Sequence, residues 1–259
     1  MCSRDGRVQC EPPISSTSSQ KDALAENLSR KIPSRAGEPR YGQIGLPLDL
    51  KTSSCARIVV VDYRTGNVNS IKRTLDRIGS RSIISSRLED VTHADKIILP
   101  GVGHFAKAMA NLKELGLVDA LNEAVLIKGK AVLGICLGME LMAITSEEGD
   151  TRGLQWLDAD AVRFKISVAT RHKVPHMGWN RIQIKKASAL MKGVEDLSEF
   201  YFAHSYHLKI NDRSDLLNET KYGVSFPSAV ERNNVFGVQY HPEKSHRSGA
   251  QLLKNFIDM

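Results

Sequence analysis

The chain has 259 residues, of which 41% are hydrophobic and 25% charged, which is typical of a globular protein long enough to bury one or two cores. The formal net charge of +7 favours anionic substrates or partners. However, no Lys/Arg cluster alternates with aromatic residues and no nucleic-acid-binding motif is present, which excludes nucleic acid as a partner. The apolar runs are too short to span a bilayer, and none near Met1 resembles a signal peptide, so we expect no association with a membrane.

The four cysteines are unevenly distributed along the chain. Three of them, Cys2, Cys10 and Cys55, lie in the first fifth, which leaves Cys136 alone in the body. A lone cysteine cannot form an internal disulfide there, so it is either a small buried hydrophobe or a reactive thiol. This usage fits a reducing compartment, and we expect a cytoplasmic protein.

Residues 1–55 differ in composition from the rest of the chain. They contain a Ser/Thr run at 15–19, scattered prolines and few regularly spaced apolar residues. We expect a disordered N-terminal extension or a mis-assigned start, with room for a short helix at 22–31. The acidic residues of this segment argue against a transit peptide. A single folded domain is predicted for residues 56–259.

Strands and helices alternate along the first half of this domain. The run at 57–62 is β-branched, as in a buried parallel strand, and 68–78 then carries apolar residues on one helical face. Further strands are predicted at 81–85, 96–99 and 130–135, and further helices at 105–115 and 137–144. This alternation predicts an α/β fold with a parallel sheet covered on both faces.

The second half, from Gly153 onward, is richer in short strands. They are predicted at 181–184, 199–202, 223–230 and 235–240, before a closing helix at 249–257. No internal repeat is present.

The segment Gly134-Ile135-Cys136-Leu137-Gly138 lies between a predicted strand and a predicted helix, which is the arrangement of a nucleophile elbow. The turn of an elbow is so tight that side chains at the glycine positions would collide with adjacent backbone. It projects Cys136 out of the sheet and places the thiol near a helix N-terminus, where we expect a stabilised thiolate. The backbone N–H of Leu137 would then bind an oxyanion. The competing interpretation is a buried structural cysteine in a glycine-rich turn.

A thiol nucleophile needs a base, and one of the eight histidines lies in a distinctive segment. An apolar strand runs up to His241, Pro242 stops the strand ladder, and Glu243 is close enough to hydrogen-bond the imidazole. We therefore predict a Cys136–His241–Glu243 triad in which the carboxylate orients the base. The alternative for a lone histidine at a strand end is a satisfied core or surface residue.

The elbow and the His-Pro-Glu segment together resemble the class I, triad-type glutamine amidotransferases. Further segments narrow the resemblance to the glutaminase subunits of imidazole glycerol phosphate synthases; they are 62–67, 100–103, 173–180, 204–206 and 241–245. The resemblance covers residue 57 to the C-terminus. It implies a three-layer, flavodoxin-like α/β domain with a central, mostly parallel sheet.

The resemblance also implies a reaction. Glutamine would form a γ-glutamyl thioester on Cys136, ammonia would leave with a proton from His241, and water would hydrolyse the thioester. The backbone groups expected to bind the oxyanion are those of Leu137, Val102 and Gly103. The side chains expected to contact the substrate glutamine are Glu140, Ser205 and Tyr206. The family usually has Gln at the position of Glu140, so this chain keeps the acceptor oxygens there but loses the amide donor. No cofactor and no metal is implied.

A partner is implied as well. In the family, ammonia passes to a (β/α)8 synthase subunit of the HisF type, which forms imidazole glycerol phosphate in histidine biosynthesis. The partner's ligand activates the glutaminase through the 100–103 segment, where glycines would permit a peptide flip. We expect a heterodimer whose interface includes Met177, Trp179 and Lys244, because apolar anchors with a charged rim seal an interface.

Several alternatives remain at this level. A paralogous branch of the family supplies ammonia to a sugar amidotransferase in surface-polysaccharide synthesis, and the segments 244–246 and 252–256 resemble it. A non-catalytic docking module would lack a triad member, and a cysteine peptidase would not explain 173–180. His204 and His207 make a poor zinc site without a local Cys or acid. Residues 100–103 lack the third glycine of a dinucleotide fingerprint, and Trp179 could belong to the core.

Overall fold

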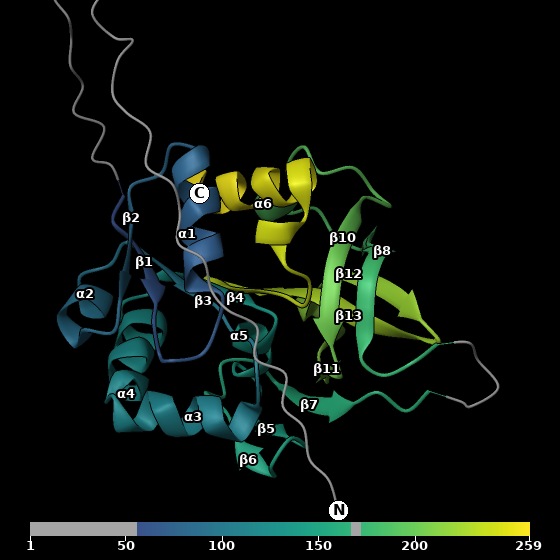
Figure 1. The fold of residues 1–259 in the computed structure, drawn as a ribbon, viewed down its shortest axis with the longest axis horizontal. Coiled ribbons are helices and arrows are strands. Elements are labelled where there is room, and N and C mark those ends of the chain that lie inside the picture. The colour runs from purple at the N-terminus through teal and green to yellow at the C-terminus, as the bar shows by residue number, and fades with distance from the viewer. Residues whose placement is uncertain (1–55, 167–171) are drawn as a thin grey trace, which may run out of the picture. The chain divides into compact units, whose positions relative to one another are not determined.

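The computed structural model describes residues 56–166 and 172–259, and its central element is an eight-stranded sheet (Figure 1). The strand order is β2-β1-β3-β4-β14-β13-β12-β9. Five strands run parallel: β1 (Ile58–Val61), β2 (Ser82–Ser85), β3 (Lys96–Leu99), β4 (Ala131–Ile135) and β14 (Val235–Val238). Beyond β14 the sheet continues with three antiparallel strands: β13 (Val224–Arg232), β12 (Leu216–Tyr222) and β9 (Gln183–Ile184). The predicted extension 1–55, with its helix at 22–31, lies outside the described residues.

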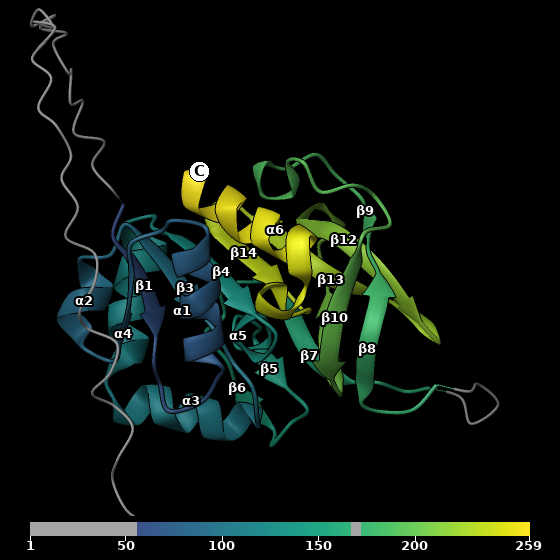
Figure 2. The same ribbon diagram turned by 45° about the horizontal axis from the view of Figure 1, so that its top comes forward.

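Helices cover both faces of the parallel part (Figures 1 and 2). Along β1, Ile58 and Val60 pack into one apolar cluster and Val59 and Val61 into the other, because successive strand residues point to opposite faces. One face is covered by α1 (Val68–Arg77) and α6 (His246–Asp258). The other is covered by α2 (Leu88–Thr92), α3 (Phe105–Glu114), α4 (Leu117–Asn122) and the π-helical turn η1 (Glu123–Ile127). The predicted three-layer α/β architecture is confirmed. No helix within the described ranges is both long and apolar enough to cross a bilayer.

Two smaller sheets lie beside the antiparallel part (Figure 2). One is an antiparallel ribbon of β8 (His176–Arg181) and β10 (Glu199–His204). The other joins β11 (Tyr206–Ile210), β7 (Ala159–Arg163), β5 (Thr145–Ser146) and β6 (Thr151–Arg152). Short 3-10 turns complete the chain: η2 (Ala189–Met191), η3 (Arg213–Asp215) and η4 (Pro242–Lys244).

The predictions for the first half are confirmed to within one residue at each end, except for the helix at 137–144. That helix, α5, covers only Leu137–Glu140. The next carbonyls, of Leu141, Met142 and Ala143, accept hydrogen bonds from backbone N–H groups of the segment 154–157, which diverts the chain from the helical path. In the second half, the strand predicted at 181–184 is wrong as one element, because the buried Ile182 interrupts it between β8 and β9.

Candidate active site

Cys136 follows β4 in a backbone conformation that a non-glycine residue adopts only under constraint, with φ 53° and ψ −113°. A Cβ on Gly134 would lie 2.7 Å from the carbonyl oxygen of Gly138, and one on Gly138 would lie 1.8 Å from that of Leu99. Both glycines are therefore required by close backbone approach, which confirms the steric reason inferred from the sequence. The geometry is that of a nucleophile elbow.

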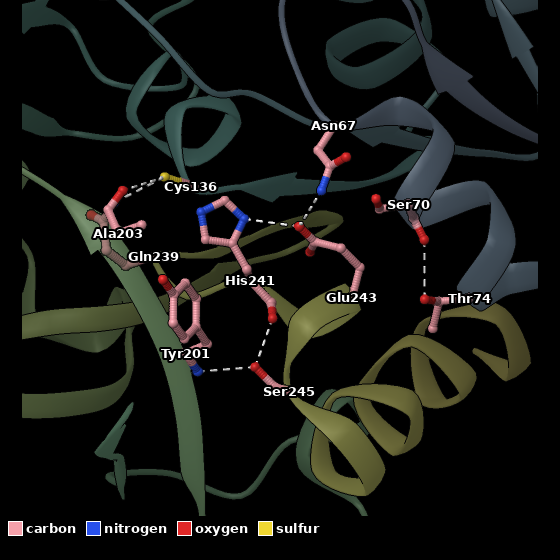
Figure 3. Close-up of polar contacts among 10 residues, drawn as sticks. All are labelled: Asn67, Ser70, Thr74, Cys136, Tyr201, Ala203, Gln239, His241, Glu243 and Ser245. Atoms are coloured by element: carbon pink, nitrogen blue, oxygen red, sulfur yellow. Dashed lines mark hydrogen bonds and ion pairs between the residues drawn. The ribbon is translucent and has the colours of Figure 1, made fainter. Parts of the chain in front are cut away.

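The segment after β14 is attached to the neighbouring ribbon through its backbone. The N–H of His241 donates to the carbonyl of Tyr201 on β10 at 2.9 Å. The hydroxyl of Ser245 donates to the carbonyl of His241 at 2.6 Å and accepts from the N–H of Tyr201 at 3.0 Å. Figure 3 shows the two contacts of the Ser245 hydroxyl, and together with the N–H of His241 they hold the His-Pro-Glu turn against β10.

The imidazole of His241 lies between the sulfur of Cys136 and the carboxylate of Glu243 (Figure 3). Its Nδ1 is 2.9 Å from Oε1 of Glu243, and both side chains are buried. The amide of Asn67 donates to the same carboxylate oxygen at 3.4 Å. Because Nδ1 faces a carboxylate, we assign the proton to Nδ1, which leaves a lone pair on Nε2. Nε2 is buried and has no hydrogen-bond partner among the described residues.

The thiol of Cys136 is buried, with 5% of the residue exposed. Burial raises its pKa well above the ordinary value, and the charge of Glu140, when that carboxyl is ionised, raises it further, while the backbone N–H of Leu137 lowers it. The N–H of Leu137 thus acts in the direction expected from the sequence, but burial opposes it and has the larger effect. The helix that follows has only four residues, so its dipole is too weak to offset desolvation. The resting thiol keeps its proton and lies 3.8 Å from the carbonyl oxygen of Ala203.

A cavity of about 210 Å³ opens beside the thiol. It brings together all the residues predicted for the oxyanion and for glutamine: Val102, Gly103, Leu137, Glu140, Ser205 and Tyr206. Met177, predicted for the partner interface, also lines it. Gly103 has φ +118°, a conformation that favours glycine.

Two polar residues of this region were missed in the sequence. Gln239 is fully buried, and its amide donates to Oε1 of Glu140 at 2.8 Å. The sequence did contain a signal for Gln239. Residues two apart on an extended segment point to the same side, and Gln239 lies two residues before His241. Glu148 lines the cavity and accepts a hydrogen bond from the N–H of Phe105 at 2.7 Å. It lies between β5 and β6, where no periodicity marks a site.

The two histidines considered as metal ligands, His204 and His207, have other partners. Nδ1 of His207 lies 3.0 Å from the carbonyl oxygen of Leu208. Nδ1 of His204 is 2.6 Å from the carbonyl of Tyr206, and its Nε2 is 3.0 Å from Nδ1 of His176. The amide of Asn180 lies 3.3 Å from the remaining nitrogen of His176. Burial lowers the pKa of both rings, to about 4 for His176, so both are neutral. We assign a chain of hydrogen bonds that runs from Asn180 through the two rings to the backbone.

Aromatic and basic side chains gather on β8, on β10 and around η4. On β8, Met177 is 64% and Trp179 is 46% exposed, because alternate residues face outward. The ring of Trp179 stacks on His246 with centroids 4.9 Å apart, and the ammonium of Lys244 lies 5.4 Å from the ring centroid of Tyr201. We call Trp179, Tyr201, Lys244 and His246 the aromatic surface. Trp179 is therefore not a core residue. Tyr201 and His246 were not predicted for this surface from the sequence.

Comparison with known proteins agrees with this geometry. Residues 59–259 match the family described as Glutamine amidotransferase class-I. A Pseudomonas aeruginosa protein named imidazole glycerol phosphate synthase subunit HisH 2 is 46% identical over 202 residues, which is 78% of this chain and 99% of that protein. A Methanococcus maripaludis protein of the same name is 46% identical over 77% of this chain and 98% of its own length.

Solved structures show the same fold at low sequence identity. A structure titled glutamine amidotransferase aligns with a TM-score of 0.59 at 18% identity, over 77% of this chain and 97% of its own. A chain of PurLQS from Thermotoga maritima aligns with a TM-score of 0.60 at 16% identity, over 78% and 98%. The family match covers most of the chain, and the chain belongs to the class I glutamine amidotransferase family.

Proposed function

We propose that this chain is the glutaminase subunit of an imidazole glycerol phosphate synthase and supplies ammonia to a synthase partner in the cytoplasm. The observation that carries the proposal is the imidazole of His241, which lies between a buried thiol and a buried carboxylate at the wall of a cavity. Relatives named as HisH subunits, 46% identical over almost their full length, support the choice of pathway.

In the first half of the reaction, His241 Nε2 takes the proton of the Cys136 thiol as the sulfur attacks the side-chain amide carbon of glutamine. A base is needed at this step because the resting thiol is protonated. The carbonyl oxygen becomes an oxyanion, which we assign to the backbone N–H groups of Leu137 and of the Val102–Gly103 segment. Collapse of the tetrahedral intermediate breaks the C–N bond, and the imidazolium of His241 gives its proton to the leaving ammonia.

In the second half, water replaces ammonia. His241 removes a proton from water, which attacks the thioester carbon, and the same oxyanion groups stabilise the second tetrahedral intermediate. Breakage of the C–S bond releases glutamate and restores the protonated thiol of Cys136. The carboxylate of Glu243 keeps the imidazole in one tautomer and stabilises it when it is charged.

Substrate binding is assigned to the walls of the same cavity. Glu148 carries a carboxylate that suits the α-ammonium group of glutamine, and the N–H of Phe105 anchors it at the start of α3. Ser205 and Tyr206 border the cavity from the connection of β10 to β11. Glu140 forms the wall one helical turn beyond the thiol.

The partner is assigned to the aromatic surface and to Met177 at the cavity mouth. Ammonia must pass to the synthase without loss to solvent, so the mouth has to be covered by a second protein. Exposed Met and Trp side chains beside a lysine form the apolar anchor and charged rim that such a seal requires. A (β/α)8 subunit of the HisF type is the partner that fits the family, in a heterodimer.

The test is glutamine turnover by the full chain, alone and with a HisF-type subunit and its nucleotide ligand. We expect very low activity alone and a rise of about two orders of magnitude or more in the complex, since lid and loop closure commonly completes such sites. Full activity in the isolated chain that no barrel subunit changes would refute the coupled-subunit proposal and leave a free-standing glutaminase.

A further inference from the structure

Glu140 is a buried carboxyl group at the wall of the thiol's cavity. It is the last residue of α5 and is only 4% exposed. Its Oε1 accepts the amide N–H of Gln239 at 2.8 Å, and the same amide nitrogen lies 4.0 Å from the sulfur of Cys136. The amide of Gln239 therefore lies between the carboxyl of Glu140 and the sulfur of Cys136, and a charge on Glu140 would act on the sulfur at short range.

Among the residues that the structure describes, the cavity walls around Glu140 offer it no lysine or arginine. The titratable groups that line the same cavity or interact electrostatically with Glu140 are Cys136, Tyr63, Glu148, His204 and Tyr206. Burial raises the pKa of Glu140 to about 8, the hydrogen bond from Gln239 lowers it, and the charge of Glu148 raises it. The carboxyl is thus protonated at neutral pH.

We propose that Glu140 acts as a neutral carboxylic acid whose Oε2–H donates a hydrogen bond to an oxygen of bound glutamine, and that loss of this proton stops glutamine turnover. The inference rests on the glutaminase function proposed above and deepens it, because it names a specificity-determining group of the same site. It makes Glu140 the donor that an ionised carboxylate could not be.

The hydrogen bonding decides which oxygen carries the proton. Oε1 already accepts from Gln239, so the proton resides on Oε2. Oε2 has no hydrogen-bond partner among the described residues, yet it is not one of their fully enclosed unpaired atoms, so it borders the cavity that would hold the substrate. A donor at this point satisfies an acceptor oxygen that glutamine brings into a buried site.

The balance of charges in the occupied cavity also favours a protonated Glu140. Zwitterionic glutamine brings one ammonium and one carboxylate into a cavity where Glu148 is the anion assigned to the ammonium. With Glu140 neutral, Glu148 is the one carboxylate among the described residues that line the cavity. An ionised Glu140 would face the α-carboxylate of the substrate without a cation and would raise the pKa of Cys136 further. Because the protonated form is the active one, activity is present below the pKa of Glu140 and falls as pH rises through it.

The test compares Glu140→Gln with the wild-type chain, both in complex with the HisF-type subunit and its ligand, by kcat/KM for glutamine from pH 7 to 9.5. Gln donates a hydrogen bond at every pH, so the ratio of mutant to wild-type kcat/KM should rise about 30-fold across this range, as expected for a group of pKa about 8. Titrations that Glu140 does not influence cancel in the ratio, and its effect on the thiol of Cys136 is measured separately by the alkylation described below. Glu147→Gln, at an exposed neighbour that lies outside the cavity, is the control and should give a flat ratio.

Two further measurements distinguish a failure of this inference from a failure of the proposed function. Glu140→Leu removes the hydrogen-bond donor and should lower kcat/KM at pH 7 by at least about tenfold relative to Glu140→Gln. Alkylation of Cys136 by iodoacetamide, followed by peptide mass spectrometry on the full chain alone, needs no glutamine turnover. It should become faster in Glu140→Gln than in wild type as pH rises. Flat ratios for both turnover and alkylation, or equal activity of the Leu and Gln variants, overturn the inference. A wild-type chain without glutamine turnover that still shows the alkylation shift would refute the proposed function alone.

Discussion

The elbow around Cys136 and the aromatic surface differ in what holds them in place. At the elbow, backbone packs directly against backbone, so Gly134 and Gly138 have no room for a single carbon atom. At the aromatic surface, Trp179 and Lys244 are exposed, and their side chains lie against the rings of His246 and Tyr201. The thiol of Cys136 is therefore positioned by the fold itself, whereas the exposed side chains of the aromatic surface remain accessible to another molecule.

This difference separates two kinds of sensitivity. Changes at the elbow should affect chemistry or folding in the isolated chain. Changes at the aromatic surface should leave both intact and appear only when a partner is added. Each of the following experiments strengthens or breaks that separation.

Cys136→Ala should have the largest effect. Removal of the nucleophile is expected to lower glutamine hydrolysis by about 10⁴-fold or more, because the remaining groups cannot form the thioester. Synthase activity driven by free ammonia should persist, which serves as the control for folding and partner binding. Wild-type glutamine turnover in Cys136→Ala would remove the thiol from the mechanism.

Glu243→Gln tests the carboxylate that faces His241. The amide keeps the shape but loses the charge that holds the Nδ1 proton and stabilises the imidazolium, so kcat should fall by about 10²- to 10³-fold. Steady-state kinetics of the complex measures this, and thermal unfolding should show a folded protein. An unchanged kcat would mean that His241 needs no orienting group.

Gly138→Ala should act through folding. The added Cβ would lie 1.8 Å from the carbonyl oxygen of Leu99, and the expected loss of unfolding free energy is about 3 kcal/mol or more. Gly129→Ala is the matched control. Gly129 has φ +63° and no atom within 4 Å of the added Cβ, so only backbone strain of about 1 kcal/mol applies. Denaturant titration that gave equal losses for the two variants would contradict the close packing of the elbow.

Trp179→Ala and Lys244→Ala should have the smallest effects in the isolated chain. Both side chains are exposed, so the unfolding free energy should change by less than about 1 kcal/mol. Stimulation of glutamine turnover by the barrel subunit should fall about tenfold, while turnover with free ammonia stays constant. Lys254→Ala, an exposed lysine paired with Asp258 on α6, is the control. A loss of stability without loss of coupling would place the aromatic surface in the fold rather than in an interface.

The two halves of the chain were not equally predictable. Parallel strands such as β1 and β3 are buried on both faces, so continuous β-branched runs identified them within one residue. Strand β12 pairs on both sides but carries Asn218, Glu219 and Thr220, and hydrogen bonds within a buried polar cluster satisfy Asn218 and Thr220. No alternation of apolar residues marks such a strand, so the sequence did not indicate it.

The sequence by itself determined the elbow, because its local turn demands glycine on both sides of Cys136. It also determined the pairing of His241 with Glu243, because side chains only two residues apart can reach each other at this turn. Only the tertiary structure decided the protonation of the thiol and of Glu140. Those depend on burial and on Gln239 and Glu148, which come from distant segments. A pKa responds to every charge and dipole within a few ångströms, and these neighbours meet only after the sheet has formed.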